Sequence, residues 1–257
     1  MQSKRGKIME FKDKRVIVSG AALGMGNLIC RQFAAAGALV TACDINFEAV
    51  ETLAQEICAA GGSAIAVRTD VEDYDSIQAA VDAAVEEFGG VDYLINFAGG
   101  AATRTFQDFA PFWERKPRLL EWGVNVNLRG ALYFSRAVFP EMMKNPGGGV
   151  IIGIGSIDSE TGTNNVEYGS SKAGIKGLIK ALAVTGAPYN IRAVCVIPGP
   201  VLTRANMATM PTLLGHAAEP DELTEFVMYM CSDKARSITG SSHLVDSGRA
   251  CAVPLLK

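Results

Sequence analysis

The chain has few of the residues that build metal centres and disulfide frameworks. Its six cysteines are scattered, none of them forms a C-x-x-C pair, and only two histidines occur among 257 residues. This pattern argues against a structural zinc site and against a disulfide scaffold, and it favours a reducing compartment. We therefore expect no metal in the functional site.

Long apolar runs and a strong charge of one sign are also missing. No uninterrupted apolar stretch reaches 18 residues, and the N-terminus MQSKRGKIMEFKDK carries charges where a signal peptide needs an apolar segment. The formal net charge is −3, so no excess of positive charge favours binding to nucleic acid or to an anionic membrane. We expect a cytoplasmic protein whose partner is a small-molecule substrate, with no nucleic acid and no membrane.

What the sequence does contain is a regular alternation of strand and helix patterns. Hydrophobic residues make up 49% of the chain and charged residues 20%, which is a globular composition. Several strand candidates are apolar on both faces, as parallel strands covered by helices on each side should be. The seven candidates are RVIVSG (15–20), ALVTACD (38–44), SAIAVRTD (63–70), VDYLINFAG (91–99), GVIIGIGS (149–156), IRAVCVIPG (191–199) and SHLVD (242–246).

Helical periodicity fills the stretches between these strands. The periodic stretches around residues 50–57 and 77–88 end at Gly61 and Gly89, which suit a left-handed helix cap. Alternating strands and helices predict an α/β fold, a doubly wound parallel sheet of about seven strands with helices on both faces. Because no linker or repeat interrupts the pattern, we expect a single domain over residues 1–257, with a flexible N-terminal tail at residues 1–11.

A glycine-rich turn follows the first strand candidate. The stretch SGAALGMG places Gly20, Gly24 and Gly26 between that strand and the start of a helix. Missing side chains let the backbone approach a pyrophosphate, whose charge is then met by free N–H groups and the positive end of the helix dipole. The spacing differs from the commoner G-x-G-x-x-G, and an ordinary glycine turn is the alternative.

An acidic residue stands where a dinucleotide site needs one. Asp44 ends the second strand candidate, at the place where a carboxylate accepts hydrogen bonds from the adenosine ribose hydroxyls and repels a 2′-phosphate. No Lys or Arg lies between Ser19 and Asn27 to bind such a phosphate. Both observations favour NAD over NADP as the cofactor, and a solvated acid in a turn is the alternative.

Two further strand ends carry residues that suit the same ligand. Asp70 and Val71 follow the third strand, where an acid can meet the adenine amino group and an apolar side chain can cover the ring. After the fourth strand, NFAGG supplies small residues at the sheet edge where ligands of open α/β folds bind. Either feature alone is typical of an ordinary strand end, so the inference depends on their order along the chain.

This ordered set of motifs resembles the short-chain dehydrogenase/reductase family in its single-domain form. The motifs are SGAALGMG, Asp44, Asp70-Val71, NFAG, NVNLRG, IGSI, YGSSK, PGPVLT and ITGSSHLVDSG, and they cover about residues 12–248. The resemblance implies an NAD-dependent oxidoreductase that interconverts a secondary alcohol and a ketone by hydride transfer.

The resemblance also implies roles for four catalytic residues. Tyr168 would be the general acid/base, and Lys172, four positions later on a helix, would lower the pKa of that phenol together with the oxidised nicotinamide. Ser156 would hydrogen-bond the substrate oxygen, with Ser159 as a nearby rival for this role. Asn127 would help to place a water in a proton relay, or it is only a helix-interior hydrogen-bonding residue.

The cofactor site implied by the resemblance draws on the ends of most strands. Its residues are Gly20, Leu23, Gly24, Met25, Gly26, Asp44, Ile45, Asp70, Val71, Asn96, Ala98, Gly99, Tyr168, Lys172, Pro198, Gly199, Val201 and Thr203. Lys172 would hold the nicotinamide ribose, and Thr203 would meet the carboxamide unless it is a helix cap. Phe97 replaces the second Asn of the usual NNAG, which puts a hydrogen bond of that amide in doubt.

Two segments are expected to shape the substrate pocket. Residues 204–220 lie where the family keeps a mobile loop, and Met207, Met210, Leu213 and Leu214 would form an apolar lid. The aromatic segment 99–122 would border the pocket or pack on a neighbouring subunit. We expect a hydrophobic or cyclic substrate, such as a sterol, a terpenoid or a cyclic alcohol. Phosphorylated or acyl-carrier-bound substrates stay open because of Arg104, Arg115, Lys116 and Arg118.

Other interpretations remain beside this one. The chain would alternatively be a 3-oxoacyl-thioester reductase of the same family, a non-catalytic nucleotide-binding sensor, or a methyltransferase, which needs no Tyr168/Lys172 pair. The family is usually tetrameric or dimeric, so a homo-oligomer is expected. Gly186 and Pro188 stand where the family usually continues a helix, and we expect that helix to stop early.

Overall fold

A computed structural model describes residues 11–252, and its seven strands form one sheet. The strand order is β3-β2-β1-β4-β5-β6-β7, and every neighbouring pair is parallel. The strands are β1 (Arg15–Ser19), β2 (Leu39–Asp44), β3 (Ser63–Arg68), β4 (Tyr93–Asn96), β5 (Gly149–Ile154), β6 (Ile191–Pro198) and β7 (Ser242–Val245). Each strand lies within its predicted range, and the predicted doubly wound α/β sheet is confirmed.

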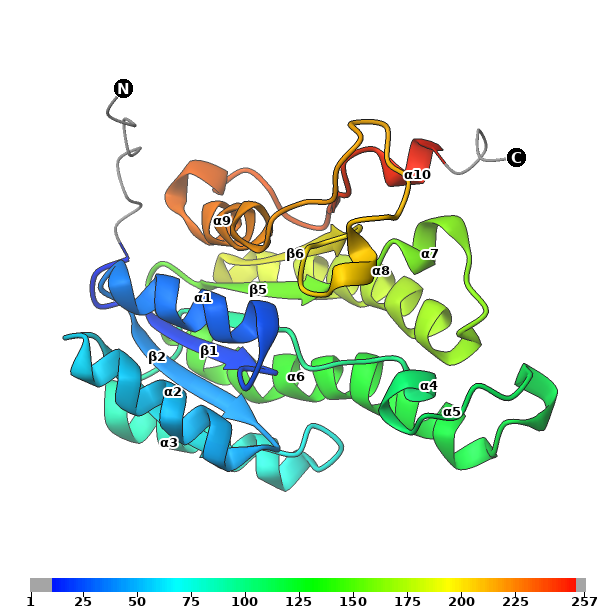
Figure 1. The fold of residues 1–257 in the computed structure, drawn as a ribbon. Helices are drawn as coiled ribbons and strands as arrows, with labels where there is room; N and C mark the ends of the chain where they lie inside the picture. The colour runs from blue at the N-terminus through cyan, green and yellow to red at the C-terminus, as the bar shows by residue number, and fades with distance from the viewer. Residues whose placement is uncertain (1–10, 253–257) are drawn as a thin grey trace.

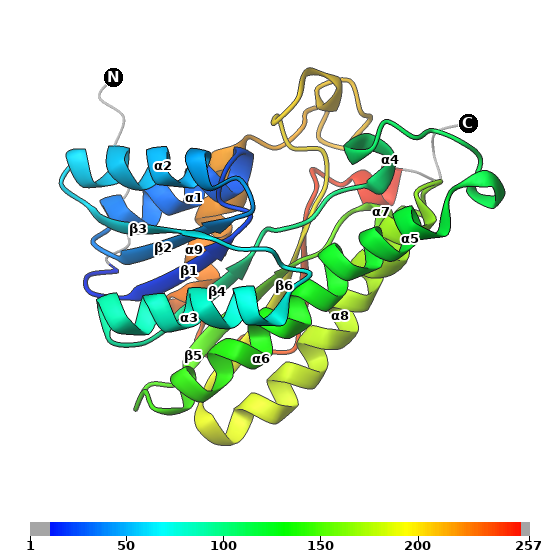
Figure 2. The same cartoon turned by 90° about the horizontal axis from the view of Figure 1, so that it is seen from below.

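Helices cover both faces of the sheet (Figures 1 and 2). One face packs against α1 (Gly24–Ala35), α2 (Phe47–Ala59) and α9 (Pro220–Cys231), and the other against α3 (Tyr74–Phe88), α6 (Gly130–Met143) and α8 (Val166–Gly186). The chain builds β1 to β3 outward in one direction and then returns to place β4 on the other side of β1. A crevice therefore opens between β1 and β4, which is where ligands of open α/β sheets bind.

The two cores alternate along the central strands. On β1, Val16 and Val18 belong to the hydrophobic cluster under α1, α2 and α9, whereas Ile17 belongs to the cluster under α3, α6 and α8. Each of these side chains is at most 1% exposed. Burial on both faces explains why the strands are continuous apolar runs in the sequence.

The predicted helix ends agree with the structure. Gly89 caps α3 in the left-handed conformation with φ +79°, and Gly61, just beyond α2, has φ +86°. Helix α8 ends at Gly186, and Ala187–Tyr189 form a single 3₁₀ turn that contains Pro188. The helix therefore stops before the proline, which supplies no N–H for a further helical hydrogen bond.

The expected N-terminal tail ends earlier than residue 11. Phe11 is 2% exposed, and its ring packs edge-on against Phe33 and Tyr93 at centroid distances of 5.0 and 6.0 Å. An isolated aromatic among charged residues gave no periodic signal, so the sequence did not indicate that it joins the core. Residues 1–10 of the expected tail lie outside the described residues.

Several short elements lie at the carboxyl edge of the sheet. They are α4 (Ala102–Thr105), a 3₁₀ turn (Phe112–Glu114), α5 (Pro117–Val124), a π-helical turn (Asn125–Arg129), α7 (Asp158–Thr161), a 3₁₀ turn (Ala205–Met207) and α10 (Arg249–Ala252). Helix α5, the π-helical turn and α6 follow one another without a break. Between residues 11 and 252, no helix is long and apolar enough to cross a membrane.

Candidate active site

A groove of about 680 Å³ lies at the carboxyl ends of the central strands. It brings together most of the predicted cofactor residues, namely Gly20, Leu23, Gly24, Met25, Gly26, Asp44, Ile45, Asp70, Val71, Ala98, Gly99 and Thr203. These residues come from the ends of β1, β2, β3, β4 and β6. The groove therefore coincides with the crevice that the strand order creates.

The glycine turn at the start of α1 depends on backbone contacts that no side chain allows. A Cβ on Gly26 would lie 2.1 Å from the carbonyl oxygen of Gly20, and a Cβ on Gly20 would lie 2.5 Å from the amide nitrogen of Ala98. Gly20 and Gly24 also have positive φ values of 73° and 58°. The turn is thus packed directly onto the end of β4 and presents bare backbone to the groove.

The first turn of α1 is suited to an anion. Leu23 precedes the helix, makes no side-chain capping bond and is 77% exposed, and no acidic residue lies in the first turn. The N–H groups at this end have no intrahelical acceptor, and they carry the positive end of the helix dipole. The turn therefore fits the pyrophosphate of a dinucleotide.

Asp44 faces the same groove from the end of β2. Its Oδ2 accepts a hydrogen bond from the backbone N–H of Ala22 at 3.1 Å, and its Oδ1 accepts one from Asn46 N–H at 3.0 Å. These bonds fix the carboxylate beside the glycine turn. Ile45, the next residue, is 58% exposed and adds no positive charge. The arrangement fits a ribose with two free hydroxyls.

Asp70 and Val71 line the groove beyond β3. The Asp70 Oδ1 accepts a hydrogen bond from Glu72 N–H at 2.9 Å, which holds the carboxylate in a tight turn. Val71 packs on Gly130 at the start of α6, where an added Cβ would lie 2.9 Å from the Cβ of the valine. Both residues therefore lie where the adenine contact was predicted.

Lys172 is buried behind the groove, at 4% exposure. Its Nζ donates a hydrogen bond to the carbonyl of Ile154 at 2.9 Å and lies 5.8 Å from the centre of the Tyr168 ring. Burial lowers the pKa of Lys172 to about 8. The predicted pair is thus neighbouring, and the lysine is anchored by the end of β5.

Tyr168 is half-buried, and burial raises the pKa of its phenol. Hydrogen bonding to Ser156 lowers this pKa, the charge of Asp158 raises it, and the charge of Arg104 lowers it. Lys172, which we expected to lower the phenol pKa, has its ammonium group hydrogen-bonded to the Ile154 carbonyl, and its effect on the phenol stays a prediction.

The hydroxyl of Ser156 is better placed than that of its rival. Ser156 is buried at the end of β5, where its Oγ accepts a hydrogen bond from Asp158 N–H at 3.2 Å and keeps its own proton for another acceptor. The hydroxyl of Ser159 is engaged with the Ser156 carbonyl at 2.7 Å and with Glu160 at 3.0 Å. The geometry therefore favours Ser156 as the residue that contacts a substrate oxygen.

Three hydrogen bonds to backbone groups hold the side chain of Asn127. Its Nδ2 donates to the carbonyls of Gly100 and Gly123 at 2.8 and 2.7 Å, and its Oδ1 accepts from Gly100 N–H at 2.9 Å. The amide thus joins the end of β4 to α5, within a π-helical turn. Such turns interrupt regular helical bonding and often occur at functional sites.

Gly99 joins the groove to these polar residues. It lines the groove, and a Cβ on it would lie 2.5 Å from the Asn127 Oδ1 and 3.2 Å from the Lys172 Nζ. Asn127, Ser156, Tyr168 and Lys172 do not themselves line the groove. Asn127 and Lys172 lie directly behind this glycine, and Tyr168 lies beside Lys172, near Ser156. The four predicted catalytic residues are therefore close to the end of the predicted cofactor site.

Some predicted cofactor residues lie beside the groove without lining it. Asn96 is 5% exposed, and its Oδ1 has no hydrogen-bond partner among residues 11–252. Pro198 and Gly199 end β6, where a Cβ on Gly199 would lie 2.4 Å from the Cβ of Asp246. Val201 is buried, and its carbonyl accepts a hydrogen bond from the Thr203 hydroxyl at 3.4 Å. These residues support the groove from below.

The sequence did not indicate several residues of the groove. Cys43, Asn46, Thr69 and Glu72 line it, although none of them was predicted for the site. Thr105, Trp122 and Arg204 also line it, and they belong to the segments 99–122 and 204–220 that were expected to shape the substrate pocket. Trp122 packs edge-on against Phe106 at 5.1 Å. It is the last residue of the segment 99–122, which was expected to border the pocket or to pack on a neighbouring subunit.

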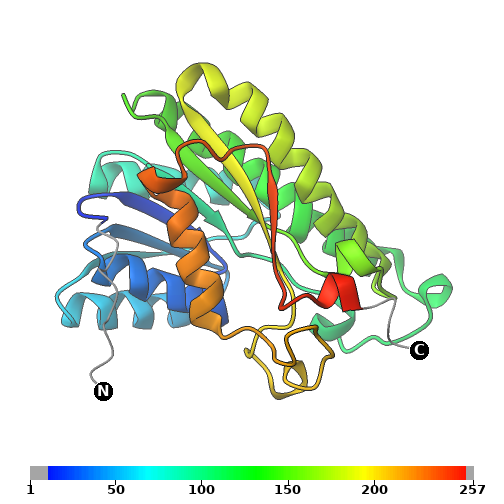
Figure 3. The ribbon, with the colours of Figure 1, turned by 90° about the horizontal axis from the view of Figure 1, so that it is seen from above.

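The two expected substrate segments behave differently. The 204–220 loop is hydrogen-bonded to the chain near α10 (Figure 3). The Nη1 of Arg249 donates to the carbonyl of Pro211 at 3.0 Å, and the N–H of Leu214 donates to the carbonyl of Ser247 at 3.1 Å. In the aromatic segment, Phe109 and Trp113 are 69% and 80% exposed. These two rings therefore face solvent.

Comparison with known proteins gives one consistent result. A family model described as short chain dehydrogenase matches residues 14–213. The chain is 38% identical over 253 residues to L-rhamnose 1-dehydrogenase (NAD(P)(+)) of Azotobacter vinelandii, covering 92% of this chain and 96% of that one. It is 32% identical over 251 residues to cyclohexanol dehydrogenase of Acinetobacter sp. (strain SE19), covering 93% and 97%.

A solved structure agrees with these relatives. The fold matches 7 alpha-hydroxysteroid dehydrogenase complexed with NADH and 7-oxo glycochenodeoxycholic acid at a TM-score of 0.83 and 30% identity, covering 94% of this chain and 96% of the other. The chain belongs to the short-chain dehydrogenase/reductase family. It is an NAD(P)-dependent oxidoreductase that acts on CH–OH groups, which confirms the resemblance of the sequence motifs.

Replacing Gly26 tests the role of the glycine turn. In Gly26→Ala the new methyl group overlaps the Gly20 carbonyl, so the turn must shift, and we expect NADH affinity to fall at least about tenfold. NADH fluorescence titration measures this, with circular dichroism as a check of folding. Gly177→Ala on α8 is the control, because its Cβ meets nothing within 4 Å. Equal affinity of both variants would contradict this role.

Proposed function

We propose that the chain is an NAD-preferring dehydrogenase in which Tyr168 is the general acid/base for a secondary alcohol or its ketone. One observation carries this proposal. Gly99 lines the groove, and its backbone lies so close to Asn127 and Lys172 that a Cβ on it would be 2.5 Å from the Asn127 Oδ1 and 3.2 Å from the Lys172 Nζ. Nicotinamide bound at this end of the groove would lie next to the phenol. When bound, the coenzyme supplies the hydride acceptor or donor.

The protein residues would divide the remaining work among them. In alcohol oxidation the phenol oxygen of Tyr168 takes the proton of the substrate hydroxyl, and in ketone reduction it returns that proton. The Ser156 hydroxyl donates a hydrogen bond to the substrate oxygen and orients it. Lys172 holds the nicotinamide ribose with the N–H groups that Ile154 does not engage.

Asn127 would act through the backbone that it holds. Since its amide is bonded to the carbonyls of Gly100 and Gly123, it would hold these two backbone segments together. A relay water would then contact main-chain atoms of the π-helical turn. The phenol pKa is raised by burial, so the charge of a bound oxidised nicotinamide is needed to lower it. Proton transfer thus depends on coenzyme binding.

The charge pattern around Asp44 supports NAD as the coenzyme. The carboxylate is fixed towards the groove by Ala22 N–H, and the neighbouring Ile45 and Asn46 carry no positive charge. Arg31, on the same side, is paired with Glu56. Among the residues that line the groove next to Asp44, none carries a positive charge, so a 2′-phosphate would meet a negative charge there.

The substrate class that we propose is a cyclic secondary alcohol with a largely hydrophobic body. Trp122 and Val126 give the groove an apolar wall near Gly99, and Met207 is half-buried in the 204–220 loop. Two relatives are named for cyclic hydrophobic alcohols, cyclohexanol and a 7α-hydroxysteroid, whereas a third is named for a sugar, L-rhamnose. Arg115 adds nothing to a basic rim because it pairs with Glu167.

We also propose a homo-oligomer, a tetramer or dimer, in a reducing compartment such as the cytoplasm. The six cysteines are free, and four of them are buried. The first alternative function is a 3-oxoacyl-thioester reductase, which would need exposed cations near the pocket, and Arg104 and Arg118 are exposed. Activity on acyl thioesters and not on cyclic alcohols would favour this alternative.

Replacing the phenol tests the proposed chemistry. In Tyr168→Phe the ring is kept and the acid/base oxygen is lost, so we expect kcat to fall by about 10²–10⁴-fold. NADH affinity should stay within about threefold, because the ring and Lys172 remain. The assay measures NAD reduction with L-rhamnose, cyclohexanol and a 7α-hydroxysteroid. Tyr189→Phe, at an exposed ring outside the site, is the matched control, and equal turnover of both variants would refute the role.

A second experiment tests the coenzyme preference. We expect kcat/KM of the natural chain to be at least about tenfold higher with NAD than with NADP, since Asp44 repels the 2′-phosphate. The double variant Asp44→Ser/Ile45→Arg removes that charge and adds a cation, so its preference should shift towards NADP. A natural chain that uses both coenzymes equally would overturn the proposed preference and leave the role of Tyr168 untouched.

A further inference from the structure

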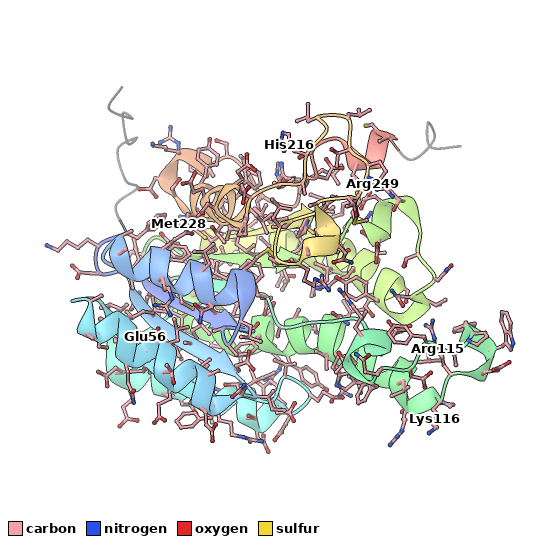
Figure 4. The ribbon with its side chains drawn as sticks, in the orientation of Figure 1. Glu56, Arg115, Lys116, His216, Met228 and Arg249 are labelled. Carbon is pink, nitrogen blue, oxygen red and sulfur yellow. The ribbon has the colours of Figure 1, made fainter. Side chains whose placement is uncertain are left out.

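A buried ion pair lies next to Tyr168 on the side away from the coenzyme groove. Glu167 precedes the tyrosine on α8, and its Oε2 lies 3.3 Å from the Nη1 of Arg115. The side chains are 2% and 8% exposed. Arg115 belongs to the segment 106–116, here called the arm, which joins α4 to α5 and projects from the body of the molecule (Figures 1 and 4).

The pair has few other partners. The Nε of Arg115 donates to the carbonyl of Ala110 at 2.9 Å, so the guanidinium joins both sides of the arm to α8. The second carboxylate oxygen of Glu167, Oε1, has no hydrogen-bond partner within residues 11–252. The cost of removing two charges from water offsets much of their attraction, so a buried ion pair adds little to the stability of the fold. We therefore interpret this pair as fixing the geometry of the arm and α8.

Helix α5 is shaped to receive the glutamate. A Cβ on Gly123 would lie 2.3 Å from the Glu167 Cγ, so only glycine allows this contact. The carbonyl of the same Gly123 accepts the 2.7 Å hydrogen bond from the Asn127 amide. The position of Glu167 against α5 therefore sets the position of the group that holds Asn127.

The ends of the arm reach the groove. Thr105, just before the arm, and Trp122, on α5 after it, both line the groove near Gly99. Within the arm, Phe109 and Trp113 face solvent and give it no core of its own. The Arg115–Glu167 pair links the arm to α8, and the Phe106–Trp122 contact links it to α5.

We propose that Arg115 and Glu167 form a positioning clamp that fixes the arm and α5 against α8, and so orients Asn127 and Trp122 beside Tyr168. Both are positioning residues, since neither lines the groove. The kinetic part of this inference rests on the proposed role of Tyr168, whereas the structural part does not. Glu167→Gln keeps the shape of the side chain and removes its charge, and this variant is the main test.

The first measurement follows Trp122 without any substrate. Trp113 and Trp122 are the two tryptophans of the chain, so a Trp113→Phe background leaves Trp122 as the single reporter. We expect acrylamide to quench Trp122 more strongly in Glu167→Gln and in Arg115→Met. Glu56→Gln is the matched control, because it breaks an exposed ion pair with Arg31 on the far side of the molecule (Figure 4). Unchanged quenching in both clamp variants would overturn the proposal.

The second measurement is kinetic and uses the cyclic alcohol that the natural chain oxidises fastest. We expect kcat/KM of each single variant to fall at least about tenfold, with most of the change in KM, because the substrate wall moves. NADH affinity should stay within about twofold, since the clamp is remote from Asp44.

The double variant Arg115→Met/Glu167→Gln separates a pair from two independent residues. If the two residues act as a pair, either substitution alone already removes their interaction. The kcat/KM of the double variant should then be no lower than that of the weaker single variant. Losses that multiply to about a hundredfold would overturn the clamp. If the natural chain oxidises no alcohol, the proposed function fails, and the Trp122 quenching of the same three variants still decides whether the clamp exists.

Discussion

The close approach of two backbone segments at the glycine turn is the constraint on which the site depends. The Gly20 carbonyl lies where a side chain of Gly26 would be, and Gly20 itself lies against the amide of Ala98. This contact fixes the start of α1 to the end of β4, so the helix N-terminus and the small residues after β4 face one groove. Because Gly99 follows Ala98 directly, the same contact sets the groove beside Lys172 and Asn127. In the proposed function, coenzyme binding and proton transfer would share this edge of the sheet.

Much of this arrangement was predictable from sequence because it depends on short-range signals. Buried parallel strands must be apolar on both faces, and left-handed turns favour glycine, so the strands and the ends at Gly61 and Gly89 followed from pattern alone. The carboxyl ends of parallel strands meet at one edge, so residues as far apart as Asp44 and Thr203 were expected in one groove, and both line it. The roles of Tyr168 and Lys172 came from the resemblance, and the structure places these residues next to each other.

Other features depend on which side chains meet in space, and sequence patterns do not encode this. The Arg115–Glu167 pair joins residues about 50 positions apart, whereas the sequence left Arg115 open as one of four cations that would form a basic pocket rim. The Asn127 amide is bonded to the main chain of Gly100 and Gly123, and its expected role in placing a water stays a prediction. The phenol of Tyr168 is half-buried, and desolvation raises its pKa more than Ser156 and the charge of Arg104 lower it.

Together these features describe a site in which a cyclic alcohol and a nicotinamide ring would meet at Gly99, with Tyr168 on the substrate side. Direct transfer of hydrogen between them tests this account most directly. Cyclohexanol deuterated at the alcohol carbon should give NADH that carries one deuterium, in water of ordinary isotopic composition, as measured by mass spectrometry. Oxidation of the alcohol with no deuterium in NADH would mean that the two ligands do not meet in one site, and it would contradict the account.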